Sequence, residues 1–258
     1  MGLVGRIAAS IGWKLYPLLA IVGVWWFLVD RGTLGNEFVM PPPGKVWDQA
    51  RTMIDDGTLS DEIRTTFTRV FGAYLLAVVV GVVVGTMIGR IQVVRWITRP
   101  VVSFLFPTPK VAIYPAMTII FGLGAASKVA LGFAEALFPV LLATAAATSQ
   151  VEPRMSWSAL ALGTSRPATL FRVIVPAALP QILTGARIGL VGSIVGVYLG
   201  EMIVGSDGLG QMMAVAYRTL NTPEMYVSII TISLAGLLLD RSFLMLRNRL
   251  LAWSEEEH

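Results

Sequence analysis

The 258-residue chain is 55% apolar and only 14% charged, with a formal net charge of +4 and a mean hydropathy of +0.71. This composition excludes an ordinary soluble domain, and the lack of cysteine in the sequence excludes disulfides, thiol catalysis and Cys-based metal sites. The only histidine is His258, so no internal imidazole is available as a base, a proton relay or a metal ligand. We predict a polytopic membrane protein that binds no cofactor or metal.

The first apolar run predicts a membrane span at residues 15–29, after a basic segment at residues 1–14. A charged start followed by an apolar stretch also fits a signal peptide, but no small-residue cleavage site follows, so we expect an uncleaved span. The connection at residues 30–64 carries more acidic than basic residues, and we assign it to the non-cytoplasmic side. Within it, VWDQARTMI predicts a short amphipathic helix at the membrane interface.

Five more apolar runs predict spans at residues 67–88, 101–121, 129–148, 182–204 and 226–246. Prolines in the third of the six spans predict kinks or a partly unwound stretch; they are Pro107, Pro109 and Pro115. Glycine repeats in the second and fifth spans predict close helix contact; they are Gly81, Gly85, Gly89, Gly185, Gly189, Gly192, Gly196 and Gly200. Arginines cluster after the second and sixth spans, which indicates cytoplasmic ends there.

The predicted fold class is therefore all-α, with six transmembrane helices at residues 15–250 and both termini in the cytoplasm. Residues 251–258 form a cytoplasmic tail. Between the fourth and fifth spans lies a long cytoplasmic connection, at about residues 150–180, where two to eight residues would suffice.

Residues 157–180 of this connection read WSALALGTSRPATLFRVIVPAALP. We expect one helix at residues 155–162, a stop at Gly163, an N-cap at Thr164 or Ser165, and a second helix that ends by Pro176. The second helix has an apolar face formed by Leu170, Phe171, Val173 and Ile174. Such a face needs a cover, which is either a partner protein or the lipid headgroups.

The same stretch resembles the conserved loop of ABC-importer permeases, in which a glycine is followed at fixed distance by a hydrophobic-x-hydrophobic-Pro end. Gly163, Ser165 and the run Val175–Pro180 (VPAALP) carry this resemblance. It extends over roughly residues 15–250, through segments similar to those of nitrate, sulfonate and taurine permeases: Pro109–Pro115, Phe121–Gly124, Ser127, Lys128, Arg187, Glu201, Met202 and Gly208–Gly210. In place of the family's Glu-Ala-Ala, this chain has Trp157, Ser158 and Ala159, so an acidic contact is lost.

The resemblance implies a coupling helix that inserts into a cytoplasmic ATPase subunit. It assigns ATPase coupling to Trp157, Ser158, Ala159, Gly163, Ser165, Arg166, Leu170, Phe171, Arg172, Pro176 and Pro180. It further implies a bacterial inner-membrane location, a second permease chain (identical or different), two ABC ATPase subunits with ATP and Mg²⁺, and an extracytoplasmic binding protein. The sequence has no G-x-x-x-x-G-K-[ST] motif, so we expect ATP hydrolysis on a separate chain.

Ionisable residues at membrane depth are costly and suggest a functional role. Four candidates for the translocation path or its gating are Lys110, Glu135, Arg187 and Glu201. Arg187 also fits a side chain that snorkels to the headgroups, and Glu201 also fits a hydrogen bond to the loop at residues 207–210. Lys110 and Glu135 fit either an ion pair or contacts with solute.

These features predict a permease subunit of a binding-protein-dependent importer, which forms an alternating-access path for a small anionic, sulfonate-like, nitrate-like or organic solute. A stand-alone secondary transporter or channel is the alternative, and it would act without an ATPase. An intramembrane enzyme is disfavoured, because the sequence offers no clustered set of polar catalytic residues.

Overall fold

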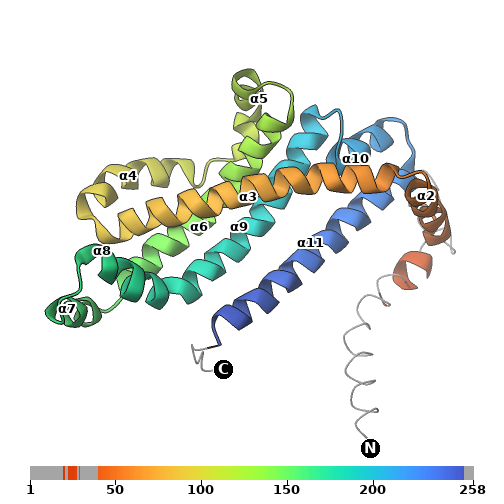
Figure 1. The fold of residues 1–258 in the computed structure, drawn as a ribbon. Coiled ribbons are helices and arrows are strands. Elements are labelled where there is room, and N and C mark those ends of the chain that lie inside the picture. Colours follow the sequence, from red (N-terminus) through yellow and green to blue (C-terminus); the bar gives the residue numbers. More distant parts are fainter. Residues whose placement is uncertain (1–19, 21–22, 28, 30–39, 253–258) are drawn as a thin grey trace, which may run out of the picture. The chain divides into compact units, whose positions relative to one another are not determined.

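The computed structural model describes residues 20, 23–27, 29 and 40–252, and all regular structure in this part of the chain is helical. The helices are α2 (Pro43–Asp55), α3 (Thr58–Arg90), α4 (Gln92–Leu105), α5 (Lys110–Phe121), α6 (Ala125–Gln150), α7 (Pro153–Ala161), α8 (Arg166–Thr169), the π-helix η1 (Leu170–Ile174), α9 (Val175–Val204), α10 (Leu209–Arg218) and α11 (Thr222–Leu250) (Figure 1). Most of the predicted first span, the segment 1–14 and most of the tail lie outside the described residues.

The chain divides into two compact units, and each is considered by itself. The first unit comprises Met1–Asp61 and Met212–Thr231, and the second comprises Glu62–Gln211 and Ile232–His258. In the first unit, the predicted amphipathic helix is present as α2, which buries Val46 and Met53. The second unit holds the predicted loop and all four candidate path residues.

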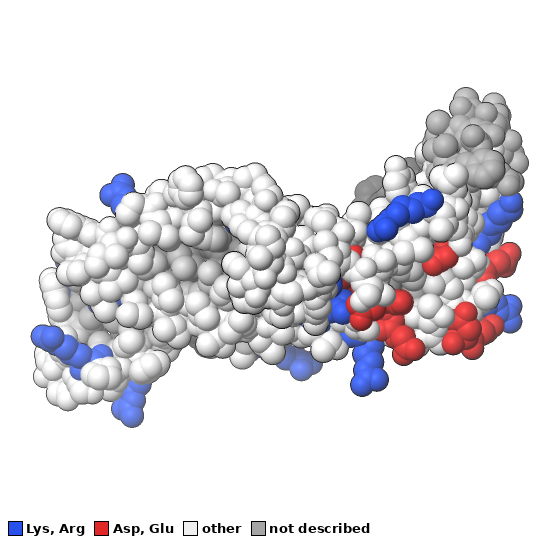
Figure 2. Space-filling model, turned by 90° about the horizontal axis from the view of Figure 1, so that it is seen from above, with Lys and Arg blue, Asp and Glu red and all other residues white. Residues whose placement is uncertain are grey.

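Four described helical segments are long and apolar enough to cross a membrane: Thr58–Arg90, Ala125–Gln150, Arg166–Val204 and Thr222–Leu250. They contain the predicted second, fourth, fifth and sixth spans. Wide areas of the face seen in Figure 2 carry no charged side chain, as expected for a surface against lipid tails.

The predicted third span is not one continuous helix. It corresponds to α4 and α5, whose axes are bent by 102° at a short break, so the described chain has four spans, or five if this pair forms one. Pro107 and Pro109 lie in the break, where they cannot donate backbone hydrogen bonds. Pro115 lies inside α5, so the unwinding is confined to the first two prolines.

The centre of the second unit is the contact between α6 and α9, which α5 also joins. Glycine permits this approach: a Cβ atom at Gly196 of α9 would lie 2.8 Å from the Cα of Gly132 and 2.9 Å from the carbonyl oxygen of Leu131, both on α6. On α3, a Cβ at Gly85 would lie 2.6 Å from the carbonyl oxygen of Leu141. The predicted close packing of the glycine-bearing spans is therefore confirmed, with α6 as their shared partner.

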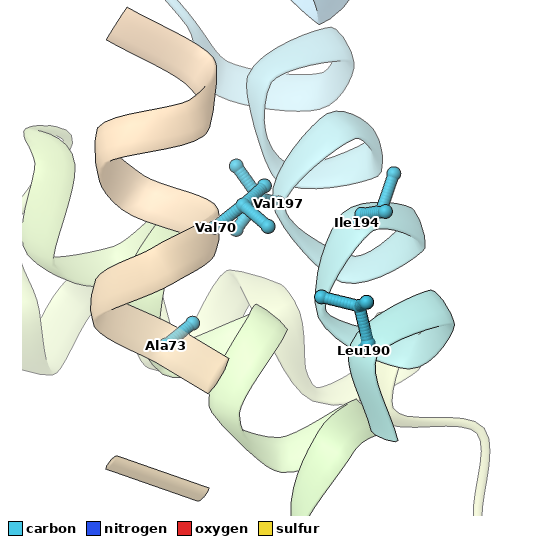
Figure 3. Close-up of a cluster of buried hydrophobic side chains, with 5 residues drawn as sticks. All are labelled: Val70, Ala73, Leu190, Ile194 and Val197. Atoms are coloured by element: carbon cyan, nitrogen blue, oxygen red, sulfur yellow. The ribbon is translucent and has the colours of Figure 1, made fainter. Parts of the chain in front are cut away.

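Between α3 and α9 lies a cluster of buried apolar side chains: Val70, Ala73, Leu190, Ile194 and Val197 (Figure 3). Side chains from α6 and from the second-unit part of α11 pack around it, among them Phe133, Ile232 and Phe243. Burial of these side chains fixes the helices that carry the polar residues described next.

Candidate functional site

The loop after α6 contains the predicted pair of helical pieces. Helix α7 covers most of the expected first piece, and Gly163 follows with φ +85°, a left-handed conformation that favours glycine. Ser165 caps α8, because its hydroxyl oxygen accepts a hydrogen bond from the backbone N–H of Ala168 at 3.4 Å. Pro167 lies in the first turn of α8, so the predicted stop and restart are confirmed.

The second piece does not end by Pro176, which corrects the sequence prediction. The chain passes from α8 through the π-helical turn η1 directly into α9, so one helical segment runs from Arg166 to Val204. Pro176 follows the π turn by two residues and Pro180 lies further inside α9, and neither residue can donate a backbone hydrogen bond. The π turn loosens the hydrogen-bond ladder immediately before Pro176.

The apolar face of this loop is narrower than predicted. Ile174 is buried in a cluster with Ala147, Val151, Ala178 and Ile182, and Leu170 packs against the same cluster. Packing within the chain therefore covers two of the four residues of the predicted apolar face, Leu170 and Ile174.

Five large apolar side chains of the loop are exposed, and the three most exposed are Trp157 (66%), Leu162 (87%) and Phe171 (71%); the other two are Met155 and Leu160. Ser158, Arg166 and Arg172 are also exposed, whereas Ala159 is half-buried. In Figure 1, α7 and α8 lie at the end of the bundle where α3 ends and α4 begins. The loop thus presents an apolar surface with basic neighbours at one end of the second unit.

A buried polar network lies at the opposite end of α3. Glu201 of α9 is fully buried, and its carboxylate accepts hydrogen bonds from Thr66 Oγ1 (2.8 Å), Arg69 Nη1 (2.7 Å) and the backbone N–H of Gly210 (3.1 Å). Arg69 Nη2 also donates to Asp207 Oδ1 at 2.7 Å. The predicted bond from Glu201 to the loop at residues 207–210 is present.

Further contacts from α3 hold the same loop. The backbone N–H of Gly208 donates to Glu62 Oε2, and that of Leu209 donates to Thr66 Oγ1 at 2.8 Å. Gly208 has φ +95°, and a Cβ there would clash with the Glu201 carboxylate, so both conformation and space require glycine.

The α3 half of this network was not predicted from the sequence. Glu62, Thr66 and Arg69 are spaced i, i+4, i+7, which places them on one helix face, and this spacing was the available signal. Asp207 lies in the loop outside the spans: partial burial raises its pKa, but the hydrogen bond and charge of Arg69 outweigh this and leave the pKa below its ordinary value.

Arg187 is paired with an acidic residue that the sequence analysis did not identify. Its guanidinium forms a two-point ion pair with Asp240 of α11, with Nε–Oδ1 at 2.6 Å and Nη2–Oδ2 at 2.8 Å. A paired charge is cheaper at membrane depth than a free one, and the fork of Arg matches a carboxylate. Asp240, which was not predicted, therefore fixes α9 to α11.

Lys110 and Glu135 are not brought together as an ion pair in the described part of the chain. Lys110 Nζ donates to the carbonyl oxygen of Phe106 at 2.8 Å and lies 5.2 Å from the ring centre of Phe138. Glu135 is half-buried on α6. Among the described residues no group of three or more His, Cys, Asp or Glu side chains is placed to hold a metal ion.

Comparison with known proteins adds independent information. The family model for the binding-protein-dependent transport system inner membrane component matches residues 77–251. The taurine transport system permease protein TauC of Escherichia coli is 32% identical over 256 residues, which cover 97% of this chain and 91% of the relative. The nitrate import permease protein NrtB of Synechocystis sp. is 28% identical, over 86% of this chain and 83% of its own.

A solved structure is similar in fold. A chain of the MetNI methionine ABC transporter, determined in inward-facing conformations, matches with a TM-score of 0.58 and 19% identity over 75% of this chain and 94% of its own. The helical fold, the sequence relatives and the family match are all consistent with one family of membrane proteins. The chain belongs to the family of binding-protein-dependent transport system inner membrane components, the ABC-importer permeases of bacterial inner membranes.

Proposed function

We propose that this chain forms the membrane path of an ATP-driven importer and is driven through the loop between α6 and α9. The observation that carries the proposal is the exposed apolar surface of Trp157, Leu162 and Phe171, on a loop whose two helical pieces are fixed by Gly163 and Ser165. We refer to these three side chains as the docking surface. Apolar anchors of this kind are what a groove on a partner ATPase would bury.

In this mechanism two permease chains pair, and two cytoplasmic ATPases bind their docking surfaces. ATP-driven closure of the ATPases draws the two loops together, and because α8, η1 and α9 are continuous, the movement is carried directly into a membrane-spanning helix. An extracytoplasmic binding protein delivers solute to the path when it opens outward. The opposite side of the membrane carries the loop at residues 205–210.

We further propose that the solute is a small molecule that carries an anionic group. The relatives named for taurine and nitrate transport handle a sulfonate and an oxyanion, respectively. Lys110 supplies a cation on α5 beside the break between α4 and α5, and contact with it would offset part of the cost of removing an anion from water. Glu135, which is half-buried on α6, is the second path residue that we propose.

Coupled ATP hydrolysis by the reconstituted complex tests the docking role. Gly163→Asp strains a left-handed position and Phe171→Asp places a charge on the docking surface, so each should abolish assembly or coupled hydrolysis. Leu250→Asp, an exposed apolar position at the end of α11, is the matched control and should assemble normally. Normal hydrolysis in both loop variants would refute the docking role and favour a carrier or channel that needs no ATPase.

A further inference from the structure

A pocket of about 580 Å³ lies between the end of α3 and the pieces α7, α8 and η1, all within the second unit. Two arginines line it, Arg90 and Arg166, and none of the residues lining it is acidic. Its apolar walls include Leu160, Leu170 and Ile174. The pocket thus combines two cationic groups with a hydrophobic wall, and the docking surface does not use it.

Most N–H donors of the two guanidinium groups are unused in the described part of the chain. A guanidinium has five N–H donors, and Arg90 uses one at Nη1, toward the carbonyl oxygen of Thr148 at 3.3 Å. Arg166 is exposed, and its guanidinium has no hydrogen-bond or ion-pair partner in the described part of the chain. Guanidinium groups bind phosphate oxygens by paired, charge-assisted hydrogen bonds, so an anionic group is the ligand that they suit.

Ser156 supplies an independent observation. This residue of α7 lines the same pocket and is only 6% exposed, yet its hydroxyl has no hydrogen-bond partner among the described residues. Buried hydroxyls are nearly always paired, because an unpaired one loses its bonds to water without replacement. A ligand oxygen in the pocket would supply the missing partner.

The position of the pocket favours a lipid as its ligand over a free anion. Arg90 ends the candidate span Thr58–Arg90, and Arg166 begins the loop piece that continues into α9, so the orientation predicted from the sequence places the pocket at the cytoplasmic surface of the membrane. Its apolar wall would contact glycerol and the first acyl carbons, whereas free phosphate would gain nothing from that wall. We propose that this pocket binds the phosphate headgroup of an anionic phospholipid and ties the loop to the membrane surface.

Native mass spectrometry of the purified full-length protein with phosphatidylglycerol or phosphatidylcholine tests this site. We expect one tightly bound phosphatidylglycerol, and about a tenfold loss of its affinity in Arg90→Gln, the effect of one charge-assisted hydrogen bond. Ser156→Ala should lose about threefold, because a neutral hydrogen bond contributes less. Arg249→Gln removes the same charge from the exposed end of α11, outside the pocket, and should bind phosphatidylglycerol as the native chain does.

Several results would overturn the proposal. These are equal affinity for phosphatidylcholine, the same loss in Arg249→Gln as in Arg90→Gln, or displacement of the lipid by millimolar inorganic phosphate, which would identify a site for free anions. Loss of bound lipid when the ATPase assembles would assign the pocket to the ATPase instead. Arg90 and Ser156 lie outside the docking surface, so a failure here leaves the ATPase experiment unaffected.

Discussion

At the scale of single residues, Glu201 is a buried carboxylate whose removal from water must be compensated by hydrogen bonds. A carboxylate without solvent exposure is stable only when its oxygens are bonded, and Arg69, Thr66 and Gly210 supply those bonds. Asp207 shares Arg69, so this one guanidinium joins α3, α9 and the loop between α9 and α10. The network holds the loop in place and occupies the Glu201 carboxylate in this conformation.

Removal of Arg69 should therefore be costly. Arg69→Met leaves the Glu201 carboxylate buried without its cation, and we expect a loss of about 3–5 kcal/mol in the free energy of unfolding. The change is measured as a fall in the melting temperature of the purified protein in detergent. Arg64→Met, at an exposed position of the same helix, is the control. If both variants melt alike, the network does not stabilise the fold.

Asp207 predicts a dependence of stability on pH. Its pKa in the folded protein is lowered from the ordinary value of 3.8, so the carboxylate prefers the folded state. Its contribution is complete above that value and is lost as pH falls through the lower folded pKa. Melting scans at successively lower pH should show a smaller acid-induced loss in Asp207→Asn than in the native chain. An identical loss in both would remove Asp207 as a contributor.

At the scale of helices, close packing on α6 requires glycine at particular places. A Cβ at Gly196 would lie less than 3 Å from backbone atoms of α6, whereas a Cβ at Gly236 of α11 would meet only Ile194 Cδ1, at 3.9 Å. The two glycines are both helical and both in spans, so they form a matched pair.

Alanine at these two positions should have opposite effects. Gly196→Ala forces α9 away from α6 and should lower the melting temperature, because backbone atoms cannot yield as a flexible side chain can. Gly236→Ala should leave stability unchanged or raise it by up to about 1 kcal/mol, the gain in helix propensity. Equal tolerance at both sites would show that the α6–α9 contact relaxes easily.

Some features of the loop helices could be predicted from the sequence, and others could not. The end of the first loop piece and the start of the second were predictable, since Gly163 and Ser165 act on their own neighbours. The continuation of the second piece past Pro176 was not predictable, because a proline usually ends a helix and no local pattern indicated the π turn that precedes it. The burial of Ile174 depended on side chains at the end of α6, and no local pattern contains that contact.

At the scale of the whole molecule, the orientation in the membrane follows from the positive-inside tendency and can be tested directly. The sequence lacks cysteine, so single introduced thiols give an unambiguous signal. Thr58→Cys and Ser158→Cys are both at exposed positions. A membrane-impermeant maleimide applied to intact spheroplasts should label Thr58→Cys at once and Ser158→Cys only after permeabilisation. The reverse pattern would place the docking surface outside and exclude its coupling to a cytoplasmic ATPase.

Hydropathy, periodicity and backbone conformation are local properties, so the amino-acid order was enough to establish the helical membrane class, the position of most spans, the glycine faces and the stop at Gly163. The pairing of charges required the folded chain. Arg187 meets Asp240 and Arg69 meets Glu201 across 53 and 132 residues of sequence. Any of several acids would satisfy an arginine in a low-dielectric interior, and only the packing of α3, α9 and α11 brings one particular carboxylate within reach.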